Sequence, residues 1–274
     1  MSLATNTLPL QGAGGSILDK IVENKRKEIA IAKAQVAVAE LEQSEFFWRE
    51  CYSFRESLLH PDRTGIIAEF KRRSPSKGVI NDTVGVKDVT KGYAAAGASA
   101  LSVLTDKDFF MGQKADLIEA RNNNTIPILR KDFMIDEYQV LEAKAWGADI
   151  ILLIAAILTP QEIHQLAAQA KSLGLNVLLE VHNLQELQRS INPNLDAIGV
   201  NNRNLADFSV SVERSFELAE HIPDEFMKIS ESAISNPHVI KQLKAAGFNG
   251  FLIGENFMRQ ADPGAAMREF VKEL

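Results

Sequence analysis

The sequence has only one cysteine and no surplus of basic residues. The single cysteine, Cys51, excludes an internal disulfide and fits a reducing compartment, and we expect it to be inert. The chain carries 30 basic and 36 acidic residues, for a net charge of -6. Because a nucleic-acid-binding surface needs a basic surplus, we expect no nucleic-acid partner, although a local basic pocket could hold an anion.

Long apolar runs are absent as well. The longest, IILLIAAIL at 150–158, is far too short to span a bilayer. Residues 1–15 contain neither the basic segment nor the long apolar segment of a secretion signal, and their GAGGS cluster is not preceded by a strand, as a nucleotide-binding loop would be. We therefore expect a soluble cytoplasmic protein with no membrane partner, and a flexible tail at 1–15.

The residues that are present predict a globular chain with a large core, since 46% are hydrophobic and only 16 are glycine and 9 proline. Residues 16–63 are interpreted as a helical extension. Apolar residues recur at helical spacing after Ser16, and Asp19 completes a weak capping box. Larger side chains of this extension are predicted to cover one end of the core: Phe46, Phe47, Trp48, Phe54 and Leu58.

Short apolar runs alternate with helical segments from residue 66 onward. Eight strands are predicted, at 66–70, 100–104, 127–130, 149–154, 176–181, 196–200, 227–231 and 250–254. Several helices are predicted to end at a glycine just before the next strand, namely at Gly97, Gly147, Gly174 and Gly247. Two helix starts carry an N-cap followed by proline, at Thr159 and Asn236.

A strand and a helix repeated about every 25 residues require a parallel sheet. Eight such units predict a closed (β/α)8 barrel over residues 66–274, an α/β fold that typically takes roughly 250 residues. The alternative is an open doubly wound sheet. That fold is less suited to the strand count, and the G-x-G-x-x-G expected after its first strand is missing.

The first strand raises the question of function, because IIAEFKRRSPSKG at 66–78 places charges inside an apolar run. Side chains two residues apart share a face of a strand, so Glu69 and Lys71 are predicted to point away from the helices and into the barrel. Active sites of such barrels lie at the carboxyl ends of the strands. Further polar residues stand at that end of other predicted strands: Lys131, Glu180, Asn201, Arg203 and Glu231. Gly254 stands at that end of the last strand.

Eight segments in order, one for each predicted strand, resemble the indole-3-glycerol phosphate synthase family. They are IIAEFKRRSPSKG, LSVLTDKDFFMG, PILRKDFMIDEYQ, GADIILLIAAIL, LLEVHN, IGVNNRNL, ISESAI and FLIGENFM. The segment SILDKIVENKRKEIA is similar to the extra leading helix of that family. The resemblance covers nearly the whole chain.

The resemblance implies decarboxylating ring closure of 1-(2-carboxyphenylamino)-1-deoxyribulose 5-phosphate, without metal or organic cofactor. It implies that Lys131 is the general acid, that Glu180 is its partner in dehydration, and that Glu69 handles or positions a further proton. Lys71 is implied to contribute both to catalysis and to anion binding. The remaining residues implied to bind substrate are Ser74, Phe110, Phe133, Asn201, Arg203, Glu231, Ser232, Ala233, Gly254 and Glu255.

The phosphate of the substrate is expected at the loops after the last two strands, which contain Ser232, Ala233, Gly254 and Glu255. The family usually has glycine where Ala233 stands, and alanine resists a positive φ angle. Glu255 would repel a phosphate unless its carboxylate turned away and only its N–H faced the ligand.

Other interpretations stay open at this point. Glu69 and Lys71 could form a structural ion pair, and phenylalanines are often ordinary core residues. Lys131 could instead be the Schiff-base nucleophile of a phosphosugar aldolase, the barrel could belong to a phosphosugar isomerase, or it could bind a metabolite without catalysis. His182 follows Glu180, but no second histidine stands at metal-ligand spacing, so we predict no metal site. We expect a monomer or a weak homo-oligomer.

Overall fold

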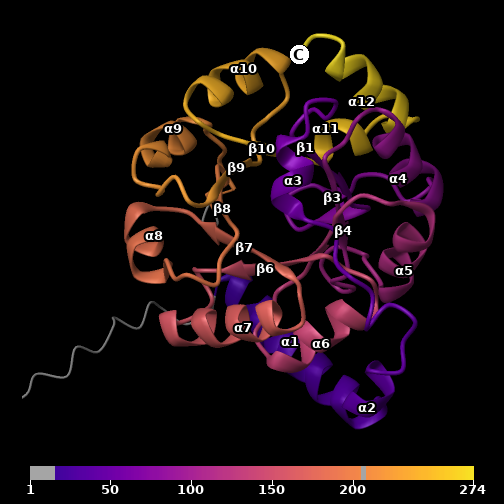
Figure 1. Cartoon of the computed structure of the whole chain (residues 1–274). Helices are drawn as coiled ribbons and strands as arrows, with labels where there is room; N and C mark the ends of the chain where they lie inside the picture. Colours follow the sequence, from indigo (N-terminus) through magenta and orange to yellow (C-terminus); the bar gives the residue numbers. More distant parts are fainter. Residues whose placement is uncertain (1–15, 205–207) are drawn as a thin grey trace, which may run out of the picture.

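Eight parallel strands close into a barrel in the computed structural model, which describes residues 16–204 and 208–274 (Figure 1). The predicted tail at 1–15 lies outside the described residues. The strands are β1 (Ile66–Phe70), β4 (Ala100–Leu104), β5 (Ile128–Lys131), β6 (Ile150–Ile154), β7 (Asn176–Val181), β8 (Ala197–Asn201), β9 (Met227–Glu231) and β10 (Gly250–Ile253). Closure by the pairing of β1 with β10 confirms the (β/α)8 barrel and excludes the open sheet.

All eight predicted strands are correct to within one residue at each end. The strand predicted at 127–130 begins one residue later, because Pro127 has no N–H to donate to a ladder. Asp149 and Asp196 precede β6 and β8 instead of opening them. Their carboxylates accept the backbone N–H of Ile128 at 2.9 Å and of Val177 at 2.8 Å, which ties the start of each strand to its neighbour.

Helices surround the strands (Figure 1). Those of the barrel are α4 (Val86–Ala95), α5 (Lys114–Asn123), α6 (Glu137–Ala145), α7 (Pro160–Ser172), α8 (Leu184–Ser190), α9 (Glu213–Ala219), α10 (Pro237–Ala245), α11 (Glu255–Met258) and α12 (Pro263–Val271). Thr159 forms a capping box with Glu162, and Asn236 caps α10. The four predicted glycines all have a positive φ angle, which confirms the predicted helix ends.

Three helices form the extension: α1 (Ile17–Gln35), α2 (Val38–Leu41) and α3 (Phe54–Leu59). The capping box of Ser16 and Asp19 opens α1 as predicted. From α3, Phe54 and Leu58 pack against inward-facing residues of the strands and close the amino end of the barrel. The prediction was wrong for Trp48, which is 78% exposed, because its neighbour Phe47 is the residue that packs against α6.

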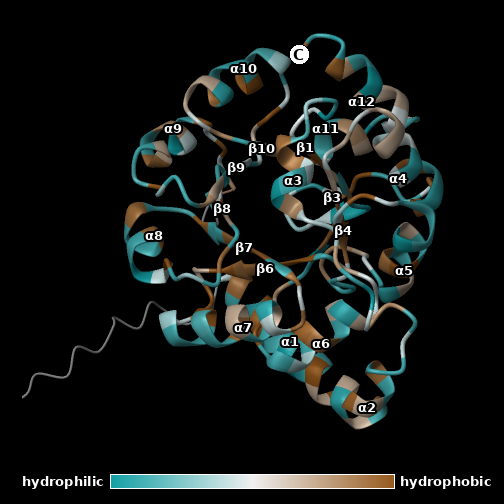
Figure 2. Cartoon of the chain, in the orientation of Figure 1, coloured by the Kyte–Doolittle hydropathy of each residue, from teal (hydrophilic) through white to brown (hydrophobic). Residues whose placement is uncertain are grey.

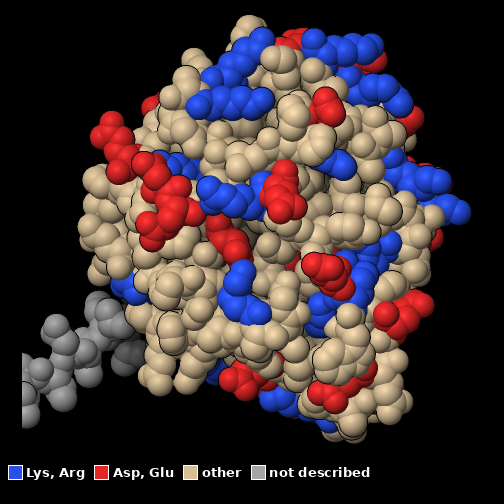
Figure 3. Space-filling view, in the orientation of Figure 1, with Lys and Arg blue, Asp and Glu red and all other residues tan. Residues whose placement is uncertain are grey.

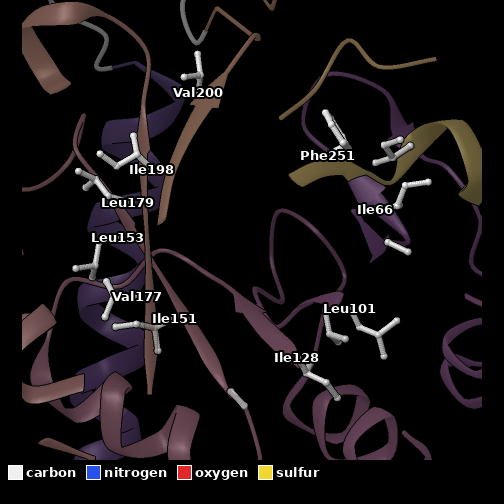
Figure 4. Close-up of a cluster of buried hydrophobic side chains, with 14 of the residues drawn as sticks. Ile66, Leu101, Ile128, Ile151, Leu153, Val177, Leu179, Ile198, Val200 and Phe251 are labelled. Atoms are coloured by element: carbon white, nitrogen blue, oxygen red, sulfur yellow. The ribbon is translucent and has the colours of Figure 1, made fainter. Parts of the chain in front are cut away.

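Two apolar layers follow the alternation of the strands. Outward residues such as Ile66, Leu101 and Val177 pack beneath the helices (Figure 4), while inward residues such as Ile67 and Leu129 fill the barrel. Figure 2 shows the same arrangement, with apolar segments along the strands and polar residues on the outer helices. This alternation decides which polar side chains enter the barrel.

The loop after β1 contains a feature that the sequence pattern did not indicate. Strands β2 (Arg73–Ser74) and β3 (Gly78–Val79) pair as a small antiparallel sheet. Each is two residues long, too short to show alternation. No helix in the described part of the chain is long and apolar enough to cross a membrane.

Candidate active site

Charged side chains enter the carboxyl end of the barrel because they continue the inward face of their strands. On β9, Met227 and Ile229 face the barrel interior, so Glu231 two residues further does so too. The same spacing relates Glu69 to Ile67 and Lys131 to Leu129. On β7, Glu180 follows the inward Leu178. We call Glu69, Lys71, Lys131, Glu180 and Glu231 the pocket cluster.

The pocket cluster is centred on Lys131. Its ammonium lies 3.4 Å from Glu180 Oε2 and 3.9 Å from Glu231 Oε2. Lys71 Nζ lies 2.7 Å from Glu69 Oε1, and the hydroxyl of Ser102 donates to Glu69 Oε2 at 3.2 Å. The alternative of an ion pair between Glu69 and Lys71 is therefore present in the geometry, but the pair lies inside a larger charged layer.

Two glycines make room for these carboxylates. A Cβ added to Gly199 on β8 would collide with Glu231 Oε1, and one added to Gly254 would lie 2.7 Å from Glu69 Oε1. Glycine is the only residue without a side chain to displace these carboxylates. The charged layer thus depends on two positions without a side chain, one in β8 and one directly after β10.

Lys131 is held in its protonated form. Burial favours the neutral amine, but the carboxylates of Glu180, Glu231 and Glu69 outweigh it and raise the pKa of Lys131 above its ordinary value. A Schiff-base lysine must be a neutral nucleophile, which burial away from carboxylates would favour. The surroundings of Lys131 therefore suit a proton or hydrogen-bond donor better than the aldolase nucleophile considered above.

The two carboxylates beside Lys131 differ in charge. Burial and the adjacent carboxylate of Glu180 raise the pKa of Glu231 to about 8. Burial also opposes ionisation of Glu180, but Lys131, His182 and a hydrogen bond from Asn201 Nδ2 at 3.1 Å lower its pKa. Near neutral pH the pair holds one proton, which lies on Glu231 while Glu180 is ionised.

A cavity of about 410 Å³ opens on the polar side of the pocket cluster. Four cationic side chains line it: Lys71, Lys77, Arg203 and Arg259. The loops predicted for phosphate also line it, through Ser232, Ala233, Gly254 and Glu255. We call this cavity the polar compartment.

An adjoining cavity of about 150 Å³ is mostly apolar. Phe110 and Phe133 line it with ring centroids 5.9 Å apart, and Ser74, Asn201 and the acidic residues of the pocket cluster line it as well. Its apolar wall is completed from β4, β6 and α1 by Leu104, Leu152, Ile154, Ile17, Leu18 and Ile21. We call this cavity the apolar compartment. Lys131 contacts this compartment, and Lys71 and Arg203 line both.

Glu255 does not turn away from the cations. Its Oε1 lies 3.8 Å from Lys77 Nζ, and its Oε2 lies 3.7 Å from Arg203. The carboxylate therefore balances positive charge in the polar compartment. Figure 3 shows acidic and basic side chains interleaved near the centre of the visible face.

Ser232 and Ala233 both adopt a positive φ angle, 67° and 62°. Left-handed geometry is disfavoured by roughly 1–2 kcal/mol for a residue with a Cβ. The loop keeps the backbone shape that glycine would adopt most easily, although alanine stands at position 233. Such local strain is typical of ligand-binding loops.

A second buried group of charges ties α1 to the rim of the barrel. Lys25 Nζ lies 2.9 Å from Asp106 and 2.9 Å from Asp132, and Arg130 lies 3.1 Å from Asp132. We call these four residues the anchor cluster. Because Asp132 directly follows Lys131, this cluster also holds the backbone next to the centre of the pocket cluster.

The predicted site residues all line one of the two compartments. Sequence reasoning missed Phe208, Lys77, Arg259 and Ser102, and did not use His182. Lys77 lies within the basic motif at 66–78, so its charge was an available signal. Phe208 had no recognisable sequence signal, because it faces the cavity from an irregular loop. Within residues 16–204 and 208–274, no three His, Cys, Asp or Glu side chains are placed to hold a metal ion.

Comparison with known proteins decides the family. The family model described as indole-3-glycerol phosphate synthase matches residues 18–270. The chain belongs to the indole-3-glycerol phosphate synthase family. Relatives named indole-3-glycerol phosphate synthase include one from Bacteroides thetaiotaomicron, 48% identical, with 94% of this chain and 98% of the relative covered. Another, from Polaromonas sp., is 43% identical, with 92% of this chain and 97% of the relative covered.

Solved structures outside this family share only the fold. The 3-hexulose-6-phosphate synthase of Salmonella typhimurium has a TM-score of 0.61 at 11% identity, over 77% of this chain and 98% of that one. The thiamine phosphate pyrophosphorylase of Pyrococcus furiosus has a TM-score of 0.58 at 16% identity, over 81% and 97%. The family is therefore assigned from the sequence matches, and the barrel alone does not assign it.

Proposed function

We propose that the protein catalyses the ring closure of 1-(2-carboxyphenylamino)-1-deoxyribulose 5-phosphate to indole-3-glycerol phosphate, carbon dioxide and water. The observation that carries this proposal is the protonated Lys131 in an apolar compartment that adjoins a cation-lined polar compartment, with Lys71 and Arg203 lining both. The substrate has an aromatic ring at one end, a phosphate at the other and a ketone between them. The apolar and anionic ends of the substrate therefore match the apolar and polar compartments.

The aromatic ring is placed in the apolar compartment, between Phe110, Phe133 and the side chains of α1. The phosphate is placed in the polar compartment, where Lys77, Arg203 and Arg259 supply positive charge and the loops of Ser232 and Gly254 supply backbone groups. Lys71 lines both and can contact the carboxylate or the sugar chain. Asn201, which donates to Glu180, orients that carboxylate.

In the first step, the ring carbon that bears the carboxylate attacks the ketone carbon. The ketone oxygen gains negative charge, and Lys131 stabilises it by donating a proton. Carbon dioxide then leaves, and the electrons of the broken bond restore the aromatic ring. Glu180, held ionised beside Lys131, supports the protonated acid before the step.

In the second step, the new hydroxyl leaves as water. An acid must protonate it, and a base must remove a proton from the adjacent carbon. Glu180 is the base in this proposal, and the Glu69–Lys71 pair handles the leaving hydroxyl. In each turnover, the side chains of the protein donate two protons to the substrate and recover one. The balance is one proton taken up from solvent, since the substrate carboxylate leaves as neutral carbon dioxide.

An enzyme assay tests this function directly. Purified protein is mixed with the substrate in the presence of a chelator, and indole fluorescence is followed. We expect a rise with the wild type and at least a 100-fold slower rise with Lys131→Met, in the range of general acid catalysis of about 10²–10⁴. A folded wild type that produces no indole would contradict the proposal. Near-normal rates with Lys131→Met would remove Lys131 from the acid role.

The aldolase alternative predicts a different result in a related experiment. Borohydride would trap a covalent adduct between Lys131 and a keto-sugar phosphate if Lys131 formed a Schiff base. We expect no adduct, because the surrounding carboxylates keep Lys131 protonated. Mass spectrometry of the treated protein measures this outcome.

A further inference from the structure

The turn that follows β9 has a backbone shape that its residues disfavour. Ser232 and Ala233 have consecutive positive φ angles of 67° and 62°, and both residues line the polar compartment. A residue with a Cβ keeps such a conformation only where neighbouring contacts fix it. The turn therefore needs contacts from outside itself.

Asn202, directly after β8, supplies such a contact. Its Nδ2 donates to the carbonyl oxygen of Ser232 at 3.3 Å and to Ser230 Oγ at 3.0 Å. The backbone of Asn202 is itself fixed, because its N–H donates to the carbonyl of Glu231 at 2.9 Å and its carbonyl accepts the N–H of Ser211 at 3.0 Å. A well-anchored residue at the end of one strand thus holds the peptide group that joins Ser232 to the next residue.

The other side of the Asn202 amide is held by α9. Its Oδ1 accepts the backbone N–H of Ser215 at 3.2 Å and the hydroxyl of Ser215 at 2.9 Å. Ser215 Oγ and Ser230 Oγ lie 2.8 Å apart, so the three side chains form a closed ring. We call Asn202, Ser215 and Ser230 the support cluster. Because the N–H of Ser215 can only donate and the carbonyl of Ser232 can only accept, these two groups fix the orientation of the amide.

The support cluster lies behind the site and not in it. Its three side chains are at most 1% exposed, and none of them lines either compartment. Ser230 lies on the outward face of β9, where neighbouring strands carry apolar residues such as Val200 and Phe251. Burying polar side chains has a cost that apolar side chains of the same shape avoid. The backbone carbonyl that the cluster holds therefore explains it better than packing does.

We propose that Asn202 is a positioning residue for phosphate binding, which acts by holding the peptide group between Ser232 and Ala233. The orientation of this peptide group sets the ψ angle of Ser232 and the φ angle of Ala233. Without the hydrogen bond from Asn202, the alanine would relax toward a negative φ angle, and this wall of the polar compartment would change shape. The inference rests on the proposed function, which places the substrate phosphate in that compartment.

Calorimetric titration with inorganic phosphate tests this role without requiring turnover. For Asn202→Ala in the full-length protein, we expect phosphate to bind about fivefold more weakly, as for the loss of one hydrogen bond. In the enzyme assay, KM should rise by the same factor and kcat should stay within about twofold, because the support cluster lies outside both compartments. Asn202→Leu fills the space without an amide and should give the same result, which covers the case in which the alanine variant does not fold.

Ser215→Ala is the matched control. It removes a buried hydroxyl from the same cluster, but the backbone N–H at position 215 still contacts Asn202 Oδ1, and the contact with Ser232 is kept. Phosphate affinity should therefore stay within about twofold of the wild type, even if thermal unfolding shifts as far as in Asn202→Ala. Equal losses of affinity in the two variants would indicate general loosening and would overturn the role of Asn202.

Glycine at position 233 provides the sharpest test. Glycine adopts a positive φ angle without strain, so the turn no longer needs Asn202. In an Ala233→Gly background, Asn202→Ala should weaken phosphate binding by less than about twofold, compared with about fivefold beside alanine. Equal losses in both backgrounds, or no loss in either, would overturn the proposal. A wild type that binds phosphate but forms no indole would contradict the proposed function instead, and the ratio of affinities would still decide the role of Asn202.

Discussion

Two buried groups of charges meet at consecutive residues of one strand end, and they are built differently. In the anchor cluster, Lys25 and Arg130 contact Asp106 and Asp132 at 2.9–3.1 Å, and Glu28 and Glu142 add contacts of 2.6 Å and 3.1 Å to the same two cations. In the pocket cluster, the contacts of the central Lys131 are longer, at 3.4 Å and 3.9 Å. Lys131 and Asp132 belong to different clusters although they are neighbours.

The difference shows how charge serves structure in one place and chemistry in the other. In the anchor cluster, every cation faces a carboxylate, so the two charged groups of each pair stabilise one another. Burial raises the pKa of Asp132, but Lys25 and Arg130 outweigh it and lower that pKa far below its ordinary range. In the pocket cluster, burial and the adjacent carboxylate of Glu180 raise the pKa of Glu231 to about 8, so Glu231 keeps its proton near neutral pH. Unmatched groups of this kind leave capacity to bind and protonate a substrate.

Among variants of the pocket cluster, Glu180→Gln should have the largest effect on catalysis. Removing the base should lower kcat by about 10²–10⁴-fold with little change in KM, because the amide cannot accept the proton. Steady-state kinetics measures both constants. An effect confined to KM would move Glu180 from catalysis to substrate binding.

Lys25→Met should have the largest effect on the anchor side. The substitution leaves Asp106 and Asp132 without their shared cation, and breaking a buried pair in this way costs about 3–5 kcal/mol of unfolding free energy. Urea denaturation measures the change. Lys27→Met on the same helix is the matched control, because Lys27 pairs with Glu23 on the surface and should leave stability unchanged. Equal effects of the two variants would refute the structural role of the anchor cluster.

Glu231→Gln should reveal the proton on the Glu231 carboxyl through a pH-dependent change in stability. A carboxyl whose pKa is raised from 4.5 to about 8 on folding stabilises the protein below 4.5, and this contribution is lost as pH rises through 8. The glutamine variant does not lose it. Relative to the wild type, the variant should therefore gain unfolding free energy between about pH 5 and about pH 9.

Urea denaturation at both pH values measures this gain. Glu217→Gln, on the exposed side of α9, is the control and should follow the wild type at both pH values. If the difference between Glu231→Gln and the wild type does not change with pH, Glu231 is not the protonated member of the pair.

Glu255→Gln should have the smallest effect and should concern binding alone. The carboxylate competes with a substrate phosphate for Lys77 and Arg203, so its removal should lower KM by about two- to fivefold, as expected for a partly exposed ion pair. Inhibition by inorganic phosphate should strengthen by the same factor. Lys77→Met should shift both quantities in the opposite direction. A rise in KM for Glu255→Gln would mean that the carboxylate orders the loop instead of competing.

The sequence was sufficient for the barrel because its signals are local and repeated. Capping residues, terminal glycines and apolar runs each mark an element within a few residues, and the i, i+2 rule aimed Glu69, Lys131 and Glu180 inward. The anchor cluster could not be predicted in this way. Lys25 lies on a helix far from Asp106 and Asp132 in sequence, and only tertiary packing brings them together. The conformation of Glu255 was also beyond prediction, since two cations from separate loops determine it.

The two glycines beside the carboxylates set a limit on how this barrel can vary. At Gly199 and Gly254 the active layer depends on the absence of a methyl group, so a library that randomises both positions should return almost only glycine among active clones. Positions that line the apolar compartment can exchange one apolar side chain for another without this restriction. The enzyme can therefore be redesigned along the walls of its pocket far more freely than at two points that carry no side chain at all.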